Sequence, residues 1–456
     1  MSLFLVGYVL AQLGVAWIVS RRTRTEDDYL VAGRSLGPGL AVFTIFATWF
    51  GAETCIGAAG AAYDEGLAGN VADPFGYSLC LLFMGLFFAR RLWSRQLSTL
   101  GDLFRQCYGP RAEKFAAAVM IPGSVLWAAA QIRALGQVLS AASGWNADAA
   151  VAFAAGVAIV YTCFGGLKAD AVTDLIQGVM LAAGLLLLGA AVLPFAGADA
   201  VVAVRVAPAA GVDVWRGLES WTIPVCGSLF SAELVARVAA ARSGGLAARA
   251  STAAAFLYVA LGLVAVALGL AGRTLAPGLA DGEQVLIHLA GSYLPAAGSS
   301  VFAGALVSAI LSTVDSCLLA AGSLAAHNIV IPWRRIRDER AKVFVNRAAV
   351  VGCGLIAYVL GREADSVYGL VEEASAFGSA GIFVTVVCGL FTRVRSERAA
   401  ISALAAGAAA YGAGRLGGVA YPFLGSLAAA IVGLGLGAAT QNGGRKGRPS
   451  QRVTAG

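Results

Sequence analysis

The stretch 305-ALVSAILSTVDSCLLAAGSLAAHNI-329 is long and apolar enough to cross a bilayer, yet it carries a carboxylate near its middle. A membrane helix needs about 20 mostly apolar residues, and an acid at its centre costs at least about 2.5 kcal/mol on insertion scales. Ser312, Asp315 and Ser316 are spaced i, i+3 and i+4, so they share one helix face, and Thr313 lies on its edge. The stretch therefore predicts a membrane helix with a functional, oxygen-rich face.

The composition of the whole chain is that of an integral membrane protein. Hydrophobic residues make up 59% of the 456 residues and charged residues only 13%, whereas soluble domains average about 25% charged residues. The formal charge of +7 comes from short basic clusters between apolar runs, a pattern of membrane topology rather than of nucleic-acid binding. None of the eight cysteines forms a CxxC pair, so we expect no disulfide framework. The expected partners are the lipid bilayer and a small solute, and not a nucleic acid.

Thirteen apolar runs are long enough to cross the membrane. They lie at about 2–20, 38–62, 73–90, 115–140, 147–165, 173–195, 219–240, 251–272, 297–327, 344–361, 367–391, 398–415 and 420–439. If the N-terminus is outside, nearly all arginine and lysine clusters fall in cytoplasmic segments, as the positive-inside rule requires. We therefore predict a multi-pass protein of the plasma membrane with an external N-terminus and a cytoplasmic C-terminus.

Two of these predicted spans are interrupted at corresponding places. The second contains 47-ATWFGAETCIGAAG-60, with glycines and an acid at membrane depth, and the seventh contains Pro224 and Gly227. These spans begin two sets of five, spans 2–6 and 7–11. Paired broken helices at equivalent positions point to an inverted-repeat secondary transporter with its site near the membrane midplane. The predicted fold is an all-α integral membrane protein of about 13 transmembrane helices around a five-plus-five core.

The predicted domain organisation follows these two sets. It comprises a first transmembrane helix with a cytoplasmic loop at 1–37, a first five-helix repeat at 38–195, an external loop at 196–218, a second five-helix repeat at 219–391, two C-terminal transmembrane helices at 392–440 and a basic cytoplasmic tail at 441–456.

Oxygen ligands on one helix face, opposite a broken helix with free carbonyls, suit a hard monovalent cation. Ser and Thr hydroxyls can instead bond back to carbonyls of their own helix. Arg133 lies deep enough in the fourth predicted span to need an acidic partner. Glu53 or Glu372 can supply it, in a structural or a gating role. Asp174, like Glu372, lies near a span end, where a solvated interfacial acid is an equally good interpretation.

Three segments together resemble the sodium:solute symporter family: 32-AGRSLGPGLAVFTIFATWFGAETCIGAAGAAYDEGL-67, 161-YTCFGGLKADAVTDLIQG-178 and 304-GALVSAILSTVDSCLLAAGSLAAHNIV-330. The resemblance implies a LeuT-like core with a sodium site. Its ligands would be the backbone carbonyls of Ala47, Phe50 and Ala309 and the hydroxyls of Ser312 and Thr313. Some members have a second sodium site, whose matching positions here are Asp174, Asp315 and Ser316.

Within that family, four segments are most similar to the high-affinity choline transporters: 47-ATWFG-51, 76-GYSLCLLFMGLFFARR-91, 127-WAAAQIRALGQ-137 and 367-VYGLVEEASAFGSAG-381. This resemblance implies an aromatic cage for a trimethylammonium group, with Trp49 and Trp127 as members and a third position near Phe230. Glu53 and Thr54 depart from the choline proteins and look more like sugar-transporting members, whose substrate contacts match Thr54, Asp73 and Glu372. The predicted substrate-binding residues are Trp49, Glu53, Thr54, Asp73, Trp127, Phe230 and Glu372.

The favoured function is sodium-coupled symport of a small organic solute by alternating access, with a choline-like or zwitterionic amine as the expected solute. Na+ is the expected coupling ion, with no organic cofactor and no obligatory protein partner. One alternative is proton coupling on the same fold, with Asp174, Asp315 or Glu53 as the carrier. Another is a solute-sensing receptor module, which would need a separate partner because the tail leaves no room for a kinase domain. No enzyme is expected, since His288 and His327 are the only histidines and no metal-ligand motif occurs; His327 is interpreted as an interface residue.

Overall fold

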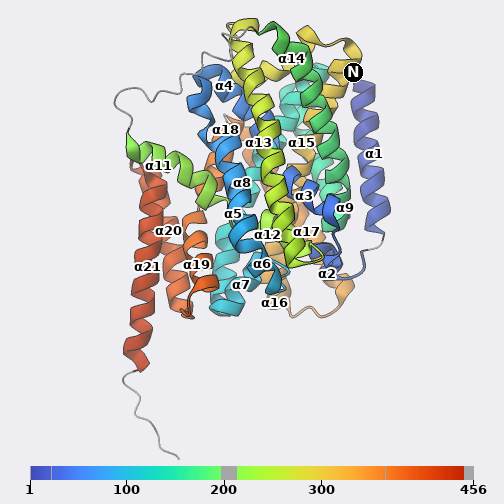
Figure 1. The fold of residues 1–456 in the computed structure, drawn as a ribbon. Coiled ribbons are helices and arrows are strands. Elements are labelled where there is room, and N and C mark those ends of the chain that lie inside the picture. The colour runs from blue at the N-terminus through green and yellow to red at the C-terminus, as the bar shows by residue number, and fades with distance from the viewer. Residues whose placement is uncertain (1, 22, 197–212, 365, 446–456) are drawn as a thin grey trace, which may run out of the picture.

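The protein is described here from a computed structural model. It describes residues 2–21, 23–196, 213–364 and 366–445, and every regular element in these ranges is helical (Figure 1). Most of the predicted external loop at 196–218 and of the predicted tail at 441–456 lies outside the described residues.

The first predicted repeat begins after α1 and contains two very long helices. The elements are α1 (Ser2–Ser20), α2 (Glu26–Val31), η1 (Ala32–Arg34), α3 (Pro38–Trp49), η2 (Glu53–Ala58), α4 (Ala59–Glu65), η3 (Gly66–Asn70), η4 (Val71–Gly76), α5 (Tyr77–Phe83), η5 (Met84–Phe88), α6 (Ala89–Ser94), α7 (Leu100–Cys107), α8 (Pro110–Ser143), α9 (Ala147–Val192) and η6 (Leu193–Phe195). Helix α9 contains both the fifth and the sixth predicted spans, and it is interrupted at Gly166, whose φ of 63° favours glycine.

The second predicted repeat and the C-terminal helices follow the same order as their predicted spans. The elements are α11 (Val214–Thr222), η7 (Ile223–Gly227), α12 (Ala232–Ala240), α13 (Gly244–Leu275), η8 (Gly282–Gln284), α14 (Val285–Tyr293), α15 (Ala296–Ser323), η9 (Leu324–Val330), α16 (Ile331–Arg334), α17 (Glu339–Glu363), α18 (Val367–Ala376), α19 (Ser379–Phe391), α20 (Glu397–Leu416) and α21 (Pro422–Arg445).

Within the described ranges, eight helices are long and apolar enough to cross a membrane, or up to ten when each of two bent pairs counts as one span. The two bent pairs are the helices predicted to be broken. Pro38–Trp49 and Glu53–Glu65 meet at 56°, and Val214–Gly227 and Ala232–Ala240 meet at 42°. The predicted interruptions are therefore confirmed, while the number thirteen stays a prediction because Ala147–Phe195 counts as one candidate span despite the interruption at Gly166.

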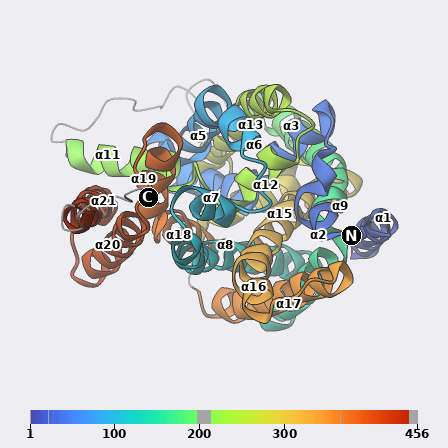
Figure 2. The ribbon, with the colours of Figure 1, turned by 90° about the horizontal axis from the view of Figure 1, so that it is seen from below.

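Helix α15 lies at the centre of the bundle. Seen from below in Figure 2, it is surrounded by α8, α9, α12 and α17, whereas α1 and the pair α20 and α21 lie at opposite edges. Of the most apolar window of its span, 89% is buried inside the protein. The polar face of α15 therefore points at other helices and not at lipid, which makes an intramembrane acid tolerable.

Candidate ion and solute site

The break after α3 releases two backbone carbonyls from the helix. In a continuous helix the Ala47 carbonyl would accept a hydrogen bond from the Gly51 amide. Here that amide donates to the Trp49 carbonyl instead, at 2.9 Å. The next amide, that of Ala52, donates to the Gln131 side chain on α8 at 3.0 Å. The broken helix thus presents carbonyl oxygens to whatever faces it.

The groups facing the break are the predicted hydroxyl pair on α15. Ser312 Oγ donates to the Ala47 carbonyl at 2.9 Å and to the Ala309 carbonyl at 3.0 Å. Thr313 Oγ1 makes the same two contacts at 3.2 Å each. Both hydroxyls are fully buried. The hydroxyls therefore bond to carbonyls of their own helix and also contact α3. The interpretation as hydroxyls that bond to their own helix and the interpretation as ion ligands thus do not exclude each other.

Four of the five predicted sodium ligands are thus joined by hydrogen bonds, because each of the two hydroxyls contacts both the Ala47 and the Ala309 carbonyl. The fifth, Phe50, ends α3 with ψ at 71°, so its carbonyl turns away from the helix axis. Three carbonyls and two hydroxyls offer only neutral oxygen atoms, which is the donor set for a weakly held monovalent cation. A Cβ at Gly51 would lie 2.5 Å from Thr313 Oγ1, so the backbone here approaches α15 as closely as only glycine allows.

The three residues matched to a second sodium site also come together, but beside a cation that the sequence analysis missed. Asp174 accepts a hydrogen bond from Thr44 at 2.5 Å, and Asp315 lies against Asp170. The guanidinium of Arg237, on α12, donates to Asp170 and to the hydroxyl of Ser316. Two like unit charges 4 Å apart repel by about 4 kcal/mol at an effective dielectric constant near 20. A metal ion at this place would meet that repulsion from Arg237 together with the attraction of the acids Asp170, Asp174 and Asp315.

Three aromatic rings pack together next to the break. Trp49 stacks on Trp127 with ring centroids 6.2 Å apart and planes at 20°. Tyr77 contacts both, at 5.7 Å from Trp49 and 6.0 Å from Trp127. We call Trp49, Tyr77 and Trp127 the aromatic trio. Two of its members were predicted, whereas Tyr77 was missed, although it lies in the quoted segment 76–91.

A carboxylate borders the aromatic trio. Glu53 is buried in the first turn after the break and accepts a hydrogen bond from Gln131 at 2.7 Å, and it also interacts with the Trp127 indole. The same Gln131 side chain holds the Ala52 amide. Gln131 therefore connects the backbone of the break to the acid, so a change at one is transmitted to the other.

Thr54 and Asp73 lie in a buried network with Tyr258, whose hydroxyl also contacts the Trp49 carbonyl at the break at 3.3 Å. Thr54 Oγ1 donates to Asp73 at 2.6 Å, and the Tyr258 hydroxyl donates to the same carboxylate oxygen at 2.9 Å. The second Asp73 oxygen has no hydrogen-bond partner among the described residues. Neither Thr54 nor Asp73 borders the cavities described next.

Two cavities flank the aromatic trio. The larger, of about 370 Å³, has Tyr77 in its wall and is lined by five acids and no lysine or arginine. These acids are Glu53, Asp64, Glu65, Glu283 and Glu372. The smaller, of about 50 Å³, is lined by Trp127, Phe230 and Glu233, among others. The predicted third cage residue, Phe230, thus shares a cavity with Trp127, and its ring packs on Phe88 at 5.0 Å.

Arg133 lies in the wall of a third cavity, together with Gln137 and Glu283. It therefore lies beside the acid-lined cavity but not in its wall.

The neighbour of Glu372, Glu373, forms an ion pair with Arg415 and accepts a hydrogen bond from Tyr411 at 2.9 Å.

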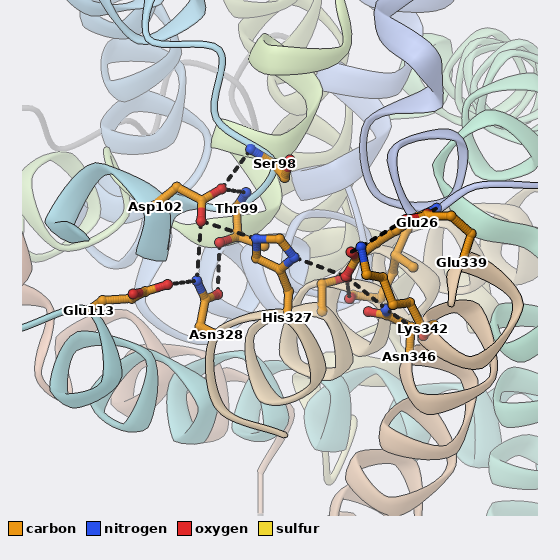
Figure 3. A network of polar contacts seen from close by, with 12 residues as sticks. Glu26, Ser98, Thr99, Asp102, Glu113, His327, Asn328, Glu339, Lys342 and Asn346 are labelled. Carbon is orange, nitrogen blue, oxygen red and sulfur yellow. Dashed lines mark hydrogen bonds and ion pairs between the residues drawn. The ribbon is translucent and has the colours of Figure 1, made fainter. Parts of the chain in front are cut away.

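The opposite, predicted cytoplasmic side is closed by a polar network, shown in Figure 3. His327 is at its centre: Nδ1 lies 2.9 Å from Glu26 and Nε2 lies 3.1 Å from Asp102. Its neighbour Asn328 bonds to Thr99 at 2.7 Å and to Glu113 at 2.9 Å. We call the residues labelled in Figure 3 the inner network. His327, whose side chain is 23% exposed, thus connects α2, α7 and η9, and its interpretation as an interface residue stays a prediction.

The ionisation of this network follows from its geometry. Burial raises the pKa of Asp102, but the hydrogen bond and the charge of His327 outweigh that effect and hold the pKa below its ordinary value. The same balance, with Lys342 as a further cation, lowers the pKa of Glu26. Because both ring nitrogens face carboxylates, the imidazole is held as the doubly protonated cation. A parallel contact between Leu36 and Ala241 adds backbone hydrogen bonds to the closure.

A helical membrane bundle with two broken helices, buried carbonyls and hydroxyls facing each other at one break, and a polar network on one side has the architecture of an inverted-repeat secondary transporter. The chain belongs to the sodium:solute symporter family, whose sequence model matches residues 29–407. The expectation of a transporter and not an enzyme is thereby confirmed.

The relatives and the fold neighbours agree with this assignment. The chain is 29% identical over 428 residues to the high affinity choline transporter 1 of Homo sapiens, covering 88% of this chain and 73% of that protein. It is 29% identical over 374 residues to the Drosophila melanogaster high-affinity choline transporter 1, covering 77% of this chain and 59% of that protein. A solved substrate-bound, outward-open state of a Na+-coupled sialic acid symporter has the same fold, with a TM-score of 0.80, 17% identity, and coverage of 96% of this chain and 97% of that one.

Proposed function

We propose that this protein is a plasma-membrane symporter that couples the uptake of a small organic cation to sodium entry by alternating access. The observation that carries the proposal is the freed Ala47 carbonyl facing the buried Ser312 and Thr313 hydroxyls. A sodium ion at this place takes its ligands from both helices, so its binding joins α3 to α15.

The coupling between ion and solute follows from the short path between their sites. The break that carries Ala47 also carries Trp49 and Glu53, and Gln131 ties that backbone to Glu53. Ordering the break by sodium therefore fixes the aromatic trio and the acid beside it. Inward movement of one positive charge is driven by about 2.3 kcal/mol per 100 mV of membrane potential.

The cationic solute is supported by the charge of the larger cavity. Its five acids and the absence of lysine and arginine from its described lining favour a cation over an anion. The aromatic trio offers faces for an ammonium group, a contact that is worth about 2 kcal/mol when desolvated. The names of the relatives point to choline-like compounds. A zwitterionic amine is the alternative, but Arg133, the cation that its anionic group would need, lies in the wall of a different cavity.

The test is uptake into proteoliposomes. A thermal-shift screen in sodium and in potassium, with amines, betaines, amino acids, sugars and carboxylates, first selects the solute. Uptake of that solute is then measured with a sodium gradient, with a pH gradient in the absence of sodium, and with neither. We expect accumulation only with the sodium gradient, whereas accumulation driven by the pH gradient alone would contradict sodium coupling. Saturable binding without flux under any gradient would instead support a receptor.

A further inference from the structure

Arg237 is the most deeply buried charge of the described chain that the proposed transport cycle leaves unexplained. It lies on α12, the inner half of the seventh predicted span, and its side chain is 1% exposed. A guanidinium removed from water must be paired with acceptors. The hydrogen-bond partners of Arg237 therefore show which oxygen atoms at this site stabilise a positive charge.

Those partners belong to two other helices. The Nη2 atom donates to Asp170 on α9 and to the Ser316 hydroxyl on α15, and Nη1 donates to the Glu233 carbonyl at 3.4 Å within α12. One cation thus connects α12 with α9 and α15. The ion proposed for the first site likewise connects α3 with α15, through ligands one helical turn away.

The residues matched to a second sodium site are already engaged within the protein. Ser316 Oγ accepts from Arg237 and donates to the Ser312 carbonyl at 2.7 Å. Asp174 accepts from Thr44, and Asp315 faces Asp170, the partner of Arg237. A metal ion at this place would compete with these contacts and would lie beside a fixed positive charge, although one oxygen each of Asp170 and Asp174 has no hydrogen-bond partner among the described residues.

We infer that the Arg237 guanidinium takes the place of a second sodium ion, so that the protein binds one sodium per transport cycle. The inference rests on the proposed function, because it assumes that the first site binds sodium. Arg237 is thus a positioning residue. Its permanent positive charge holds α12, α9 and α15 together, as a bound sodium ion would in a protein with a second site. In the rival arrangement a second sodium ion binds between the carboxyl groups of Asp174 and Asp315, which do not pair with Arg237.

The direct experiment is equilibrium binding of radioactive sodium to the purified full-length protein in nanodiscs. We expect one saturable ion per protein and a Hill coefficient of one, and we expect Ser312→Ala to remove this binding over the same concentration range. Two ions in the wild-type protein would overturn the inference and leave the proposed function intact. No saturable sodium would overturn the proposed function itself, so the two failures are distinguishable.

A variant then assigns the effect to Arg237. The double change Arg237→Met with Asp170→Asn removes both members of the ion pair, which avoids a buried unpaired charge, and keeps Asp174, Asp315 and Ser316. We expect this variant to bind a second sodium, with the Hill coefficient rising above one. Arg242→Met, which removes an exposed arginine beyond the end of the same helix, is the control and should still bind one. A well-folded double variant that binds only one ion would overturn the assignment to Arg237.

Discussion

The substitution Ser312→Ala tests the sodium site most directly, because it removes one predicted ligand and little else. The Ser312 hydroxyl contacts the Ala47 and Ala309 carbonyls at 2.9 and 3.0 Å, and Thr313 still donates to both after the change. The fold should therefore lose only about 1 kcal/mol, the net value of one hydrogen bond.

The expected loss of ion affinity is larger. A hydrogen-bonding group that contacts a charge contributes about 1.5–3 kcal/mol, and each 1.4 kcal/mol is a factor of about ten. Ser312→Ala should thus raise the half-saturating sodium concentration by roughly 10- to 100-fold. Adding Thr313→Ala should abolish measurable binding, although the two effects are not expected to add because the ligands are neighbours.

The assay is the unfolding temperature as a function of sodium concentration at constant ionic strength, since a ligand that binds only the folded state stabilises it by RT ln(1 + c/Kd), where c is the sodium concentration. Ser323→Ala is the matched control, because this serine lies buried on the same helix and donates only to its own helix, to the Leu319 carbonyl at 2.5 Å. The site assignment is refuted if Ser312→Ala and Ser323→Ala give the same sodium dependence as the wild type.

Three further predictions concern the solute pocket and the inner network. Glu53→Gln keeps the shape of the side chain and removes its charge, so affinity for a cationic solute should fall roughly tenfold, and an unchanged solute-induced thermal shift would exclude Glu53 from the pocket. Trp127→Ala should weaken binding of a quaternary amine about 30-fold, from the loss of about 2 kcal/mol of cation–π contact, while leaving sodium binding within a factor of about two. His327→Ala should lower the unfolding temperature by several degrees, whereas His288→Ala, at an exposed position, should not. Because the folded pKa of Asp102 is lowered, its stabilising effect is complete above its unfolded pKa of about 4 and lost as pH falls below it; the wild type should lose stability in that acid range more steeply than His327→Ala.

The sequence was sufficient for the parts of the site that depend on local spacing. The shared face of Ser312, Asp315 and Ser316 follows from helix periodicity, and the break opposite it is indicated by Gly51 and by the acid Glu53 two residues later. The structure confirms the break and connects four of the five predicted ligands by hydrogen bonds, while their role in ion binding stays a prediction. These features need only the chain itself, because each lies within a few residues of its cause.

The sequence was insufficient where the site depends on the bend of α12 and on pairing across the bundle. In the segment 231-SAELVARVAAAR-242, Arg237 resembles a cation near the cytoplasmic end of a span, and only the 42° bend directs it inward to Asp170. His327 pairs with Glu26, which is 301 residues away in sequence. No periodicity encodes such pairs. The one local hint was Glu233, four residues before Arg237 and on the same helix face.

The chemistry of the inner network determines how readily this side of the transporter can open. An apolar plug would cost about 25 cal/mol for each Å² newly exposed to water. The groups around His327 and Lys342, by contrast, can exchange their contacts for hydration when they separate. When this side opens, hydrogen bonds within the protein are replaced by hydrogen bonds to water. The net change in free energy is then small. In the proposed cycle this side faces the cytosol, and the ionic strength there would influence how often the side opens, because salt weakens ion pairs near the surface.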